Sequence, residues 1–400
     1  MNMPKKIFCL IVFMLLISGC AIARHAVPPD LLNNTCVLGM RDIRAFGGVP
    51  SDSFKSDVLS LLEYEKKEGL SFFDTGLRRV YPVLAISGGS ANGAYGAGLL
   101  SGWSKEGSRP EFKIVTGIST GAIIAPYAFL GSNYDDKLKE FYSKYSTKDL
   151  VELSLSNNSL GSVKPLKRLI EKYADKQLLV KIAAEYKKGR RLYVGTTNLD
   201  AQRLVIWDMG KIASIGDDKA LDLFRKIILA SASIPVAFPP VYFNVEVDGK
   251  VYDEMHVDGG TTKQVFFIYD VLQGVDNAFK GNGIDVSKIK YSIYIIRNGY
   301  VDPIWKEVPD SLSAIAERSI DTMTNAQGAG DLYQLYVFAK ASKGDFNLAS
   351  IPTANVYSSK EIFDASMMCK LFDLGFEQAS RGYPWKKIPP GMGKDLINNK

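Results

Sequence analysis

Histidine is almost absent from this chain, which has only His25 and His256 among its 400 residues. Because histidine is the side chain that most often acts as a general base near neutral pH, a base-catalysed reaction must use His256 or another residue type. His25 stands beside a Pro-Pro pair near the N-terminus, where we expect a linker. No cysteine or histidine pair has zinc-ligand spacing, so we expect no metal site and no cofactor.

Cysteine is scarce as well, with four residues in the whole chain. Cys9 lies inside an N-terminal apolar run and Cys20 lies at the end of it. Cys36 and Cys369 remain for the folded body. The sequence leaves two states open for this pair, one disulfide in an oxidising compartment or two buried free thiols.

Apolar runs long enough to cross a membrane are missing too. The N-terminal run, Ile7 to Ile17, has 11 residues, whereas a spanning helix needs about 20. It follows two lysines and ends at Ile17-Ser18-Gly19-Cys20, so we expect a signal peptide over residues 1–19. The ending resembles a bacterial lipobox, which implies that Cys20 is acylated. An ordinary signal peptide with Cys20 unmodified is the alternative.

A lipidated Cys20 implies a protein held in the bacterial cell envelope through its N-terminus, because several acyl chains on one residue anchor stably. By resemblance to Gram-negative lipoproteins, Ala21 in place of aspartate favours the outer membrane. Once residues 1–19 are removed, 47 basic and 43 acidic residues remain, a formal net charge of +4. No basic stripe with interleaved aromatics appears, so we expect no nucleic-acid partner.

Strand and helix patterns alternate from Val83 onward. Short apolar segments predict strands, and amphipathic segments such as Lys164 to Ala174 and Ala220 to Ala232 predict helices between them. The expected strands are Pro82 to Ile86, Ile114 to Thr116, Arg191 to Thr197 and Tyr291 to Ile296. This alternation predicts an α/β protein whose mainly parallel sheet is covered on both faces. The last hundred residues look helical, most clearly at Ser311 to Met323 and Leu332 to Ala341.

The pentapeptide Gly117-Ile118-Ser119-Thr120-Gly121 is the strongest chemical signal. It stands between a predicted strand and a predicted helix, as a nucleophile elbow requires. Gly117 and Gly121 leave room for a tight turn, and Ser119 is the expected nucleophile of an acyl transfer through a serine ester.

A glycine-rich loop, Ser87 to Gly98, follows the first strand. It lacks the glycine spacing of a dinucleotide fingerprint and the Gly-Lys-Ser/Thr of a phosphate loop. Backbone N–H groups approach a developing oxyanion closely where side chains are missing. We therefore expect Gly88, Gly89 and Ser90 to supply an oxyanion hole for Ser119.

Two residues compete as the base that activates Ser119. His256 fits the chain order of an α/β-hydrolase triad, but that assignment leaves Asp258-Gly259-Gly260 unexplained. An aspartate before two glycines at the end of a strand suggests a carboxylate in a cramped site lined by backbone, although a surface turn is the plainer alternative.

Together these motifs resemble the patatin-like phospholipases, and in particular their bacterial lipoprotein members. That family joins a glycine-rich loop, a G-x-S-x-G serine and an Asp-Gly-Gly/Ala aspartate in this order. The stretch Ala230 to Pro240, ASASIPVAFPP, matches the family's A-S-x-x-I-P-x-x-F-P-P segment. The resemblance runs from about Val83 to Val265 and more weakly through Leu371 to Gly375.

The resemblance implies a three-layer α/β/α patatin-like fold and a Ser119–Asp258 dyad, with Gly259 and Gly260 completing the aspartate motif. It implies a serine lipid acyl hydrolase acting on phospholipid or another acyl-ester lipid. His256 then either tunes Asp258 or packs beside it. Residues 20–79 would form a leader and linker, 80–300 the catalytic core and 301–400 a helical extension packed on the core.

Two points stay open at the level of the sequence. Many relatives carry a third glycine and then a basic residue in the glycine-rich loop, where this chain has Ser90 and Asn92. Asn92 supplies no positive charge, which puts the preference for phospholipid over simpler esters in doubt. Alternative functions are a catalytically idle envelope lipoprotein that binds lipid or a protein, and an esterase that uses His256.

Overall fold

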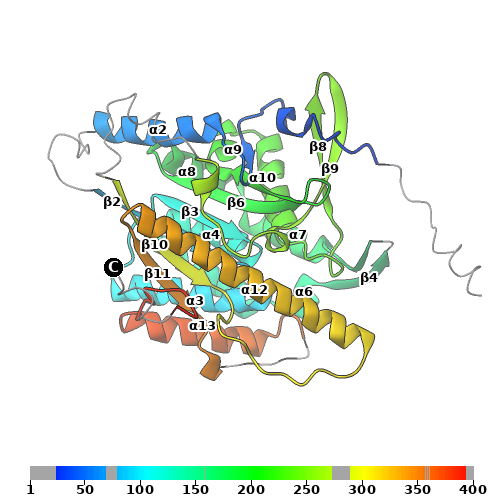
Figure 1. The fold of residues 1–400 in the computed structure, drawn as a ribbon, viewed down its shortest axis with the longest axis vertical. Helices are drawn as coiled ribbons and strands as arrows, with labels where there is room; N and C mark the ends of the chain where they lie inside the picture. Colours follow the sequence, from blue (N-terminus) through cyan, green and yellow to red (C-terminus); the bar gives the residue numbers. More distant parts are fainter. Residues whose placement is uncertain are drawn as a thin grey trace, which may run out of the picture.

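A nine-stranded, mainly parallel sheet forms the centre of the molecule (Figure 1). A computed structural model describes residues 24–68, 79–156, 158–272, 289–355, 357, 359 and 361–392. The main path of the sheet runs β1-β7-β6-β3-β2-β10-β11, and the β8–β9 hairpin joins it through β6. The strands of this sheet are β1 (Arg44–Phe46), β2 (Arg79–Ile86), β3 (Ile114–Ile118), β6 (Arg191–Asn198), β7 (Arg203–Asp208), β8 (Val241–Val247), β9 (Lys250–Asp258), β10 (Ile289–Arg297) and β11 (Asp345–Ser350). A separate small hairpin pairs β4 (Glu152–Ser156) with β5 (Ser159–Ser162).

The four strands expected from the sequence are confirmed as β2, β3, β6 and β10, which are mutually parallel. Their apolar runs are continuous because both faces of the sheet are covered. In β2, for example, Leu84 and Ile86 belong to one apolar core, whereas Val83 and Ala85 belong to the other.

Helices cover both faces of the sheet and complete the three-layer α/β/α fold that was predicted. One core is built with α3, α4, α10 and α13, and the opposite core with α2 and α12. The helices are α2 (Asp52–Lys67), α3 (Gly93–Glu106), α4 (Thr120–Leu130), α5 (Asp135–Lys144), α6 (Thr147–Leu150), α7 (Lys164–Tyr173), α8 (Lys176–Lys187), α9 (Met209–Ile215), α10 (Asp218–Ser231), α12 (Leu312–Ala341) and α13 (Ala365–Ser380). None of those in the described ranges is long and apolar enough to cross a bilayer.

The C-terminal part differs from the sequence prediction in two ways. The two helices expected there are one continuous helix, α12, which runs in front of β10 and β11 in Figure 1. Its interior contains Gly328, where a Cβ atom would stand 3.2 Å from Nη2 of Arg297, so the glycine makes room for this side chain. The segment is also not wholly helical, because β11 extends the sheet beside β10.

The N-terminal part is integrated into the core rather than forming a separate leader. β1 pairs with β7 at the edge of the sheet, and α2 buries Phe54 and Leu62 against it. His25 is not a free linker residue either, since its Nδ1 lies 2.8 Å from the carbonyl oxygen of Val251 and its ring stacks on Tyr252. The predicted signal peptide and Cys20 lie outside the described residues.

Candidate active site

Ser119 sits on a strained turn between β3 and α4. Its backbone has φ +56° and ψ −123°, a conformation that non-glycine residues rarely adopt and that is often found at functional sites. The flanking glycines make the turn possible. A Cβ at Gly117 would stand 2.3 Å from the carbonyl oxygen of Gly121, and one at Gly121 would stand 2.4 Å from that of Ile86.

Asp258 lies at the carboxyl end of β9, where it pairs with Thr196 on β6. The structure brings this carboxylate close enough to Ser119 for the serine side chain to influence its pKa, and the backbone N–H of Gly260 donates to Oδ1 at 2.7 Å. Burial raises the pKa of Asp258 to about 6, and the polar groups of Ser119 and Gly260 oppose that rise. The carboxylate is therefore a stronger base than a solvated aspartate and is still largely ionised at neutral pH.

The Asp-Gly-Gly segment is a packed turn and not a surface loop. A Cβ at Gly259 would stand 2.5 Å from the carbonyl oxygen of Gly195, so any side chain there would collide with β6. A Cβ at Gly260 would stand 3.0 Å from Oδ1 of Asp258, in the space that the carboxylate needs. Both glycines thus keep the backbone close around the aspartate.

The glycine-rich loop lies against Ser119, but its donors differ from those expected. The N–H of Gly88 donates to the carbonyl oxygen of Gln264 at 3.1 Å, so Gly88 is not available as an oxyanion donor. The N–H groups of Gly89 and Ser90 have no hydrogen-bond partner among the residues that the structure describes. Gly89 has φ +153°, and a Cβ there would stand 1.9 Å from the carbonyl oxygen of Asn298, so only glycine fits.

Asn298 holds this loop in place, a role that the sequence analysis missed. Its backbone N–H donates to Oγ of Ser87 at 2.8 Å, and its Nδ2 donates to the carbonyl oxygen of Ser87 at 2.9 Å. Its Oδ1 accepts from the N–H of Gly96 at 3.1 Å. Asn298 directly follows β10. Because ligand sites lie at the carboxyl ends of parallel strands, this position could have marked Asn298 as a candidate site residue.

Arg297, the last residue of β10, places a buried positive charge behind the same loop. Its Nη1 donates to Oγ of Ser87 and to Oε1 of Gln264, both at 3.3 Å. No carboxylate in the described part of the chain lies within ion-pair distance of this guanidinium. Burial lowers the pKa of Arg297 to about 10 against the opposing influence of Asp331, so the side chain stays charged at neutral pH.

Ser231 fixes the backbone of the nucleophile from the opposite side. Its Oγ accepts from the N–H of Ser119 at 2.9 Å and donates to the carbonyl oxygen of Gly195 at 2.7 Å. This fully buried serine is the second residue of the ASASIPVAFPP stretch. The stretch thereby ties the end of α10 to the serine turn.

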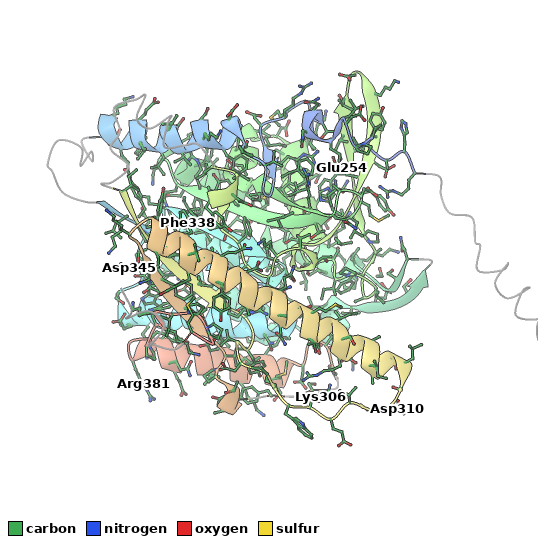
Figure 2. The ribbon with its side chains drawn as sticks, viewed as in Figure 1. Glu254, Lys306, Asp310, Phe338, Asp345 and Arg381 are labelled. Carbon is green, nitrogen blue, oxygen red and sulfur yellow. The ribbon has the colours of Figure 1, made fainter. Side chains whose placement is uncertain are left out.

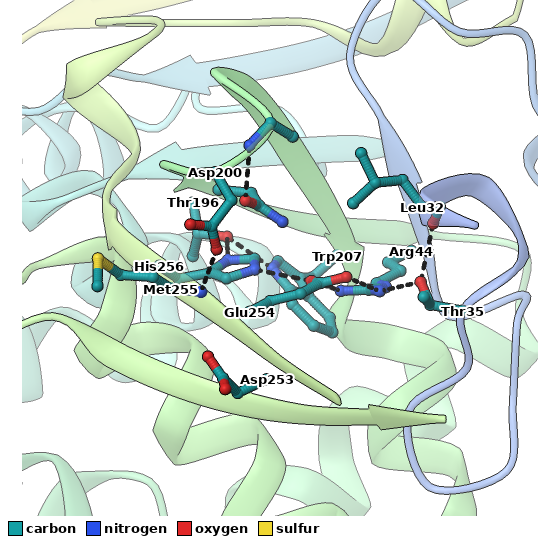
Figure 3. Close-up of polar contacts among 12 residues, drawn as sticks. Leu32, Thr35, Arg44, Thr196, Asp200, Trp207, Asp253, Glu254, Met255 and His256 are labelled. Carbon is teal, nitrogen blue, oxygen red and sulfur yellow. Dashed lines mark hydrogen bonds and ion pairs between the residues drawn. The ribbon is translucent and has the colours of Figure 1, made fainter. Parts of the chain in front are cut away.

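His256 belongs to a different network, shown in Figure 3. Its Nδ1 lies 2.9 Å from Oγ1 of Thr196, and its Nε2 lies 3.0 Å from Oε2 of Glu254. Burial lowers the pKa of His256 below its ordinary value, so the ring is neutral at pH 7. With both nitrogens engaged away from Ser119, this geometry does not support a triad through His256, and packing rather than tuning of Asp258 describes its role.

A narrow, mainly apolar cavity with a volume of about 30 Å³ lies beside the serine. Its polar rim carries Ser90, Ser119 and Thr120. The remaining lining is mostly aliphatic and aromatic and comes from Ile123, Phe141, Tyr142, Leu150, Leu166, Ala232, Ile234, Phe238, Phe363 and Met368. Such a lining suits a fatty acyl chain. A wider, charged hollow between α8 and α10 is open to solvent and shares no residue with this cavity.

Two further expectations concern metals and cysteines. Within the described ranges, no group of three or more His, Cys, Asp or Glu residues is arranged to hold a metal ion. Cys36 and Cys369 are both free, which excludes the disulfide alternative in this structure. Cys36 instead contacts the carbonyl oxygen of Glu246 at 3.2 Å, where the N-terminal segment meets β8.

The fold and site define an α/β protein with a buried serine on a strand–helix turn beside a buried aspartate. Residues 84–268 match the family model for patatin-like phospholipases. That match supports a lipid acyl hydrolase. A search of curated proteins found no match.

Among solved structures, VipD from Legionella pneumophila is similar to this chain, with 11% sequence identity and a TM-score of 0.31. The alignment covers 75% of this chain and 66% of VipD, so the chain spans about two thirds of the length of that protein.

Proposed function

We propose that this protein is a serine lipid acyl hydrolase that releases fatty acid from phospholipids or related acyl esters. The observation that carries the proposal is the proximity of Ser119, on its strained turn, to the buried Asp258 with its raised pKa. The apolar lining of the adjoining cavity supports an acyl substrate. The family match supports the same class of reaction.

In the proposed mechanism, Asp258 accepts the proton of the Ser119 hydroxyl while Oγ attacks the ester carbonyl carbon. The N–H groups of Gly89 and Ser90 stabilise the resulting oxyanion, each donor contributing on the order of 3 kcal/mol to the transition state. Protonated Asp258 then gives its proton to the departing alkoxide, which leaves an acyl ester on Ser119. A water molecule, deprotonated by Asp258, attacks that ester; Asp258 then returns the proton to Oγ of Ser119 as the fatty acid is released.

A fluorophosphonate probe tests the nucleophile. We expect the wild-type protein to be labelled, and we expect the Ser119→Ala variant to remain unlabelled, because the probe bonds only to an activated serine. The labelled peptide, read by mass spectrometry, should contain Ser119. If neither protein is labelled although both are folded, the alternative of a catalytically idle lipoprotein that binds lipid or a protein gains instead.

We further propose that the protein is a lipoprotein of the bacterial envelope, anchored through Cys20 and sorted to the outer membrane. The lipobox-like ending and the short apolar run support this, as does Ala21 after the cysteine. Metabolic labelling with a palmitate analogue should mark the wild type and leave Cys20→Ser unmarked. Equal labelling of both proteins, or of neither, contradicts the anchor.

A further inference from the structure

One edge of the sheet gathers both the candidate active site and the most exposed apolar side chains. The parallel strands β2, β3, β6 and β10 all end at this edge. Ser119 follows β3 there, and the loop after β10 carries Trp305, whose side chain is 86% exposed. That loop leads into α12, and Figure 2 labels Lys306 and Asp310 on it.

The first half of α12 presents an apolar stripe that the described part of the chain leaves largely exposed. Leu312 is 87% exposed, and Ile315, Ile320 and Met323 are each about half exposed or more. At 100° per residue these four side chains share one face of the helix. That face is opposite to the one that Leu332, Leu335 and Ala339 bury against the sheet further along the helix.

The loop before α12 covers the polar face of the helix and leaves the apolar stripe open. Nη2 of Arg318 donates to the carbonyl oxygen of Ile304 at 2.5 Å, which ties the loop to the helix one residue ahead of Trp305. Burial raises the pKa of Asp321, and Lys306 is among the charges that act on it. Trp305 and the stripe are therefore held on one structural unit.

This unit adjoins the catalytic residues. One helical turn beyond Met323, Oε1 of Gln327 accepts from Nε2 of Gln264 at 3.2 Å. The same Nε2 donates to the carbonyl oxygen of Gly260, whose N–H in turn donates to Asp258. Val236 lies in the sequence between the cavity-lining residues Ile234 and Phe238 and is 65% exposed, so it adds another exposed apolar side chain near the cavity.

Arg24, the first described residue, is held at the same edge of the sheet and lies close in the sequence to the expected anchor at Cys20. Arg24 pairs with Asp200, in the loop after β6, at 2.7 Å, and with Asp253, on the catalytic strand β9, at 2.7 Å. Cys20 lies four positions before Arg24, a reach of at most about 14 Å. An acyl anchor on Cys20 thus holds the carboxyl edge of the sheet close to the bilayer.

We propose that Trp305, Leu312, Ile315, Ile320 and Met323, which we call the apolar edge, insert into the lipid interface and bring the cavity mouth onto the bilayer. Exposed tryptophan beside aliphatic side chains on an amphipathic helix is the pattern of interfacial insertion. Residues 301–323 contain five acidic and two basic side chains, so insertion depends on apolar contact and not on anionic lipid. The proposal rests on the proposed function, because a lipid hydrolase must reach substrate in a bilayer.

Tryptophan fluorescence of the full-length lipoprotein tests the insertion directly. The protein is reconstituted in vesicles of phosphatidylethanolamine and phosphatidylcholine with brominated acyl chains, which quench only tryptophans near the lipid core. Trp103 and Trp207 are buried, and Trp385 is partly buried against Trp103, so we expect the exposed Trp305 to supply most of the quenched signal. Trp305→Phe should lose that quenching, and salt should not change it. Equal quenching in both proteins, or no quenching in the wild type, overturns the proposal. A second copy of the protein or another segment of this chain would then be the better candidate to cover the stripe.

Activity provides the second readout. Leu312→Ser/Ile315→Ser should lower turnover of vesicle phospholipid about tenfold or more and leave hydrolysis of soluble p-nitrophenyl butyrate unchanged. Val180→Ser on α8, also an exposed apolar position, serves as the matched control and should change neither rate. Equal vesicle rates for the double variant and the wild type contradict the apolar edge. If the wild type hydrolyses neither vesicle phospholipid nor p-nitrophenyl butyrate, the proposed function is contradicted instead. The quenching experiment still tests insertion in that case.

Discussion

At the scale of single residues, the site depends on one buried carboxylate held beside one strained serine. In the proposed mechanism, Asp258 takes the role that histidine has in most serine hydrolases, and burial raises its basicity above that of a solvated aspartate. The nearest histidine along the chain, His256, is occupied by Thr196 and Glu254. The scarcity of histidine in the sequence is thus consistent with a site that uses none.

The pH dependence of catalysis should report Asp258. Below its pKa of about 6 the carboxyl is protonated and cannot accept the serine proton, so kcat/KM should fall as pH drops through this value and level off above about pH 7. The measurement is kcat/KM for p-nitrophenyl butyrate across that range. A profile that stays flat through pH 6 contradicts Asp258 as the base.

Arg297 should act as a positioning residue that also supplies charge. Arg297→Gln keeps a hydrogen-bond donor for Ser87 and Gln264 but removes the positive charge, so kcat should fall by about 10- to 100-fold with little change in KM. Arg297→Lys should recover part of the loss. A boronic acid, whose serine adduct is anionic, should bind more weakly to the glutamine variant.

The thermal unfolding midpoint serves as the control for Arg297. If the glutamine variant melts like the wild type and keeps its kcat, the charge has no part in catalysis. If the lysine variant is as slow as the glutamine variant, geometry rather than charge accounts for the effect.

At the scale of elements, the N-terminal segment is a structural part of the catalytic strand. Arg44 on β1 forms two hydrogen bonds, at 2.6 and 2.9 Å, with Glu254 on β9, and both side chains are buried. Burial alone would raise the pKa of Glu254, but Arg44 and His256 lower it to about 2. This pair therefore fixes β9 four residues before Asp258.

Breaking that pair should destabilise the fold strongly. Arg44→Met leaves the Glu254 charge buried without its main partner, so the free energy of unfolding measured in urea should fall by about 3–5 kcal/mol. Arg24→Met removes a partly exposed pair and should cost about 1 kcal/mol or less. Equal losses for the two variants contradict the distinction in burial.

The Arg44–Glu254 pair also predicts how the free energy of unfolding changes at acidic pH. The folded pKa of Glu254 lies below its unfolded value of about 4.3, so its contribution is fully present above that pH. The contribution should be lost as pH falls from about 4 to about 2. Arg44→Met should show a smaller loss of stability over this interval than the wild type.

At the scale of the whole molecule, the sequence predicted what local patterns encode. The central strands and the serine turn follow from apolar runs and glycine spacing, and the three-layer arrangement follows from their alternation with helices. Arg297, Asn298 and Ser231 were missed because their roles depend on contacts with residues more than 100 positions away. The occupied N–H of Gly88 was missed for the same reason, since its acceptor is Gln264.

Helix continuity and the docking of the N-terminal segment were also beyond local patterns. The two helical patterns expected at Ser311 to Met323 and Leu332 to Ala341 form one helix, in which Gly328 leaves room for the side chain of Arg297. Arg24 and Arg44 are ordinary charged residues in the sequence, and their partners on β9 are over 200 residues away. These long-range pairs dock the N-terminal segment onto the catalytic strand β9.

The most direct test of the Ser119–Asp258 dyad compares Asp258→Asn with His256→Gln on p-nitrophenyl butyrate, with circular dichroism to confirm that both variants fold. We expect Asp258→Asn to lower kcat/KM by about 10²- to 10⁴-fold, because the general base is lost. His256→Gln should stay within about tenfold of the wild type, because its ring contacts Thr196 and Glu254 and not the nucleophile. Abolished turnover in a folded His256→Gln variant, together with a nearly unchanged rate in Asp258→Asn, would contradict the dyad.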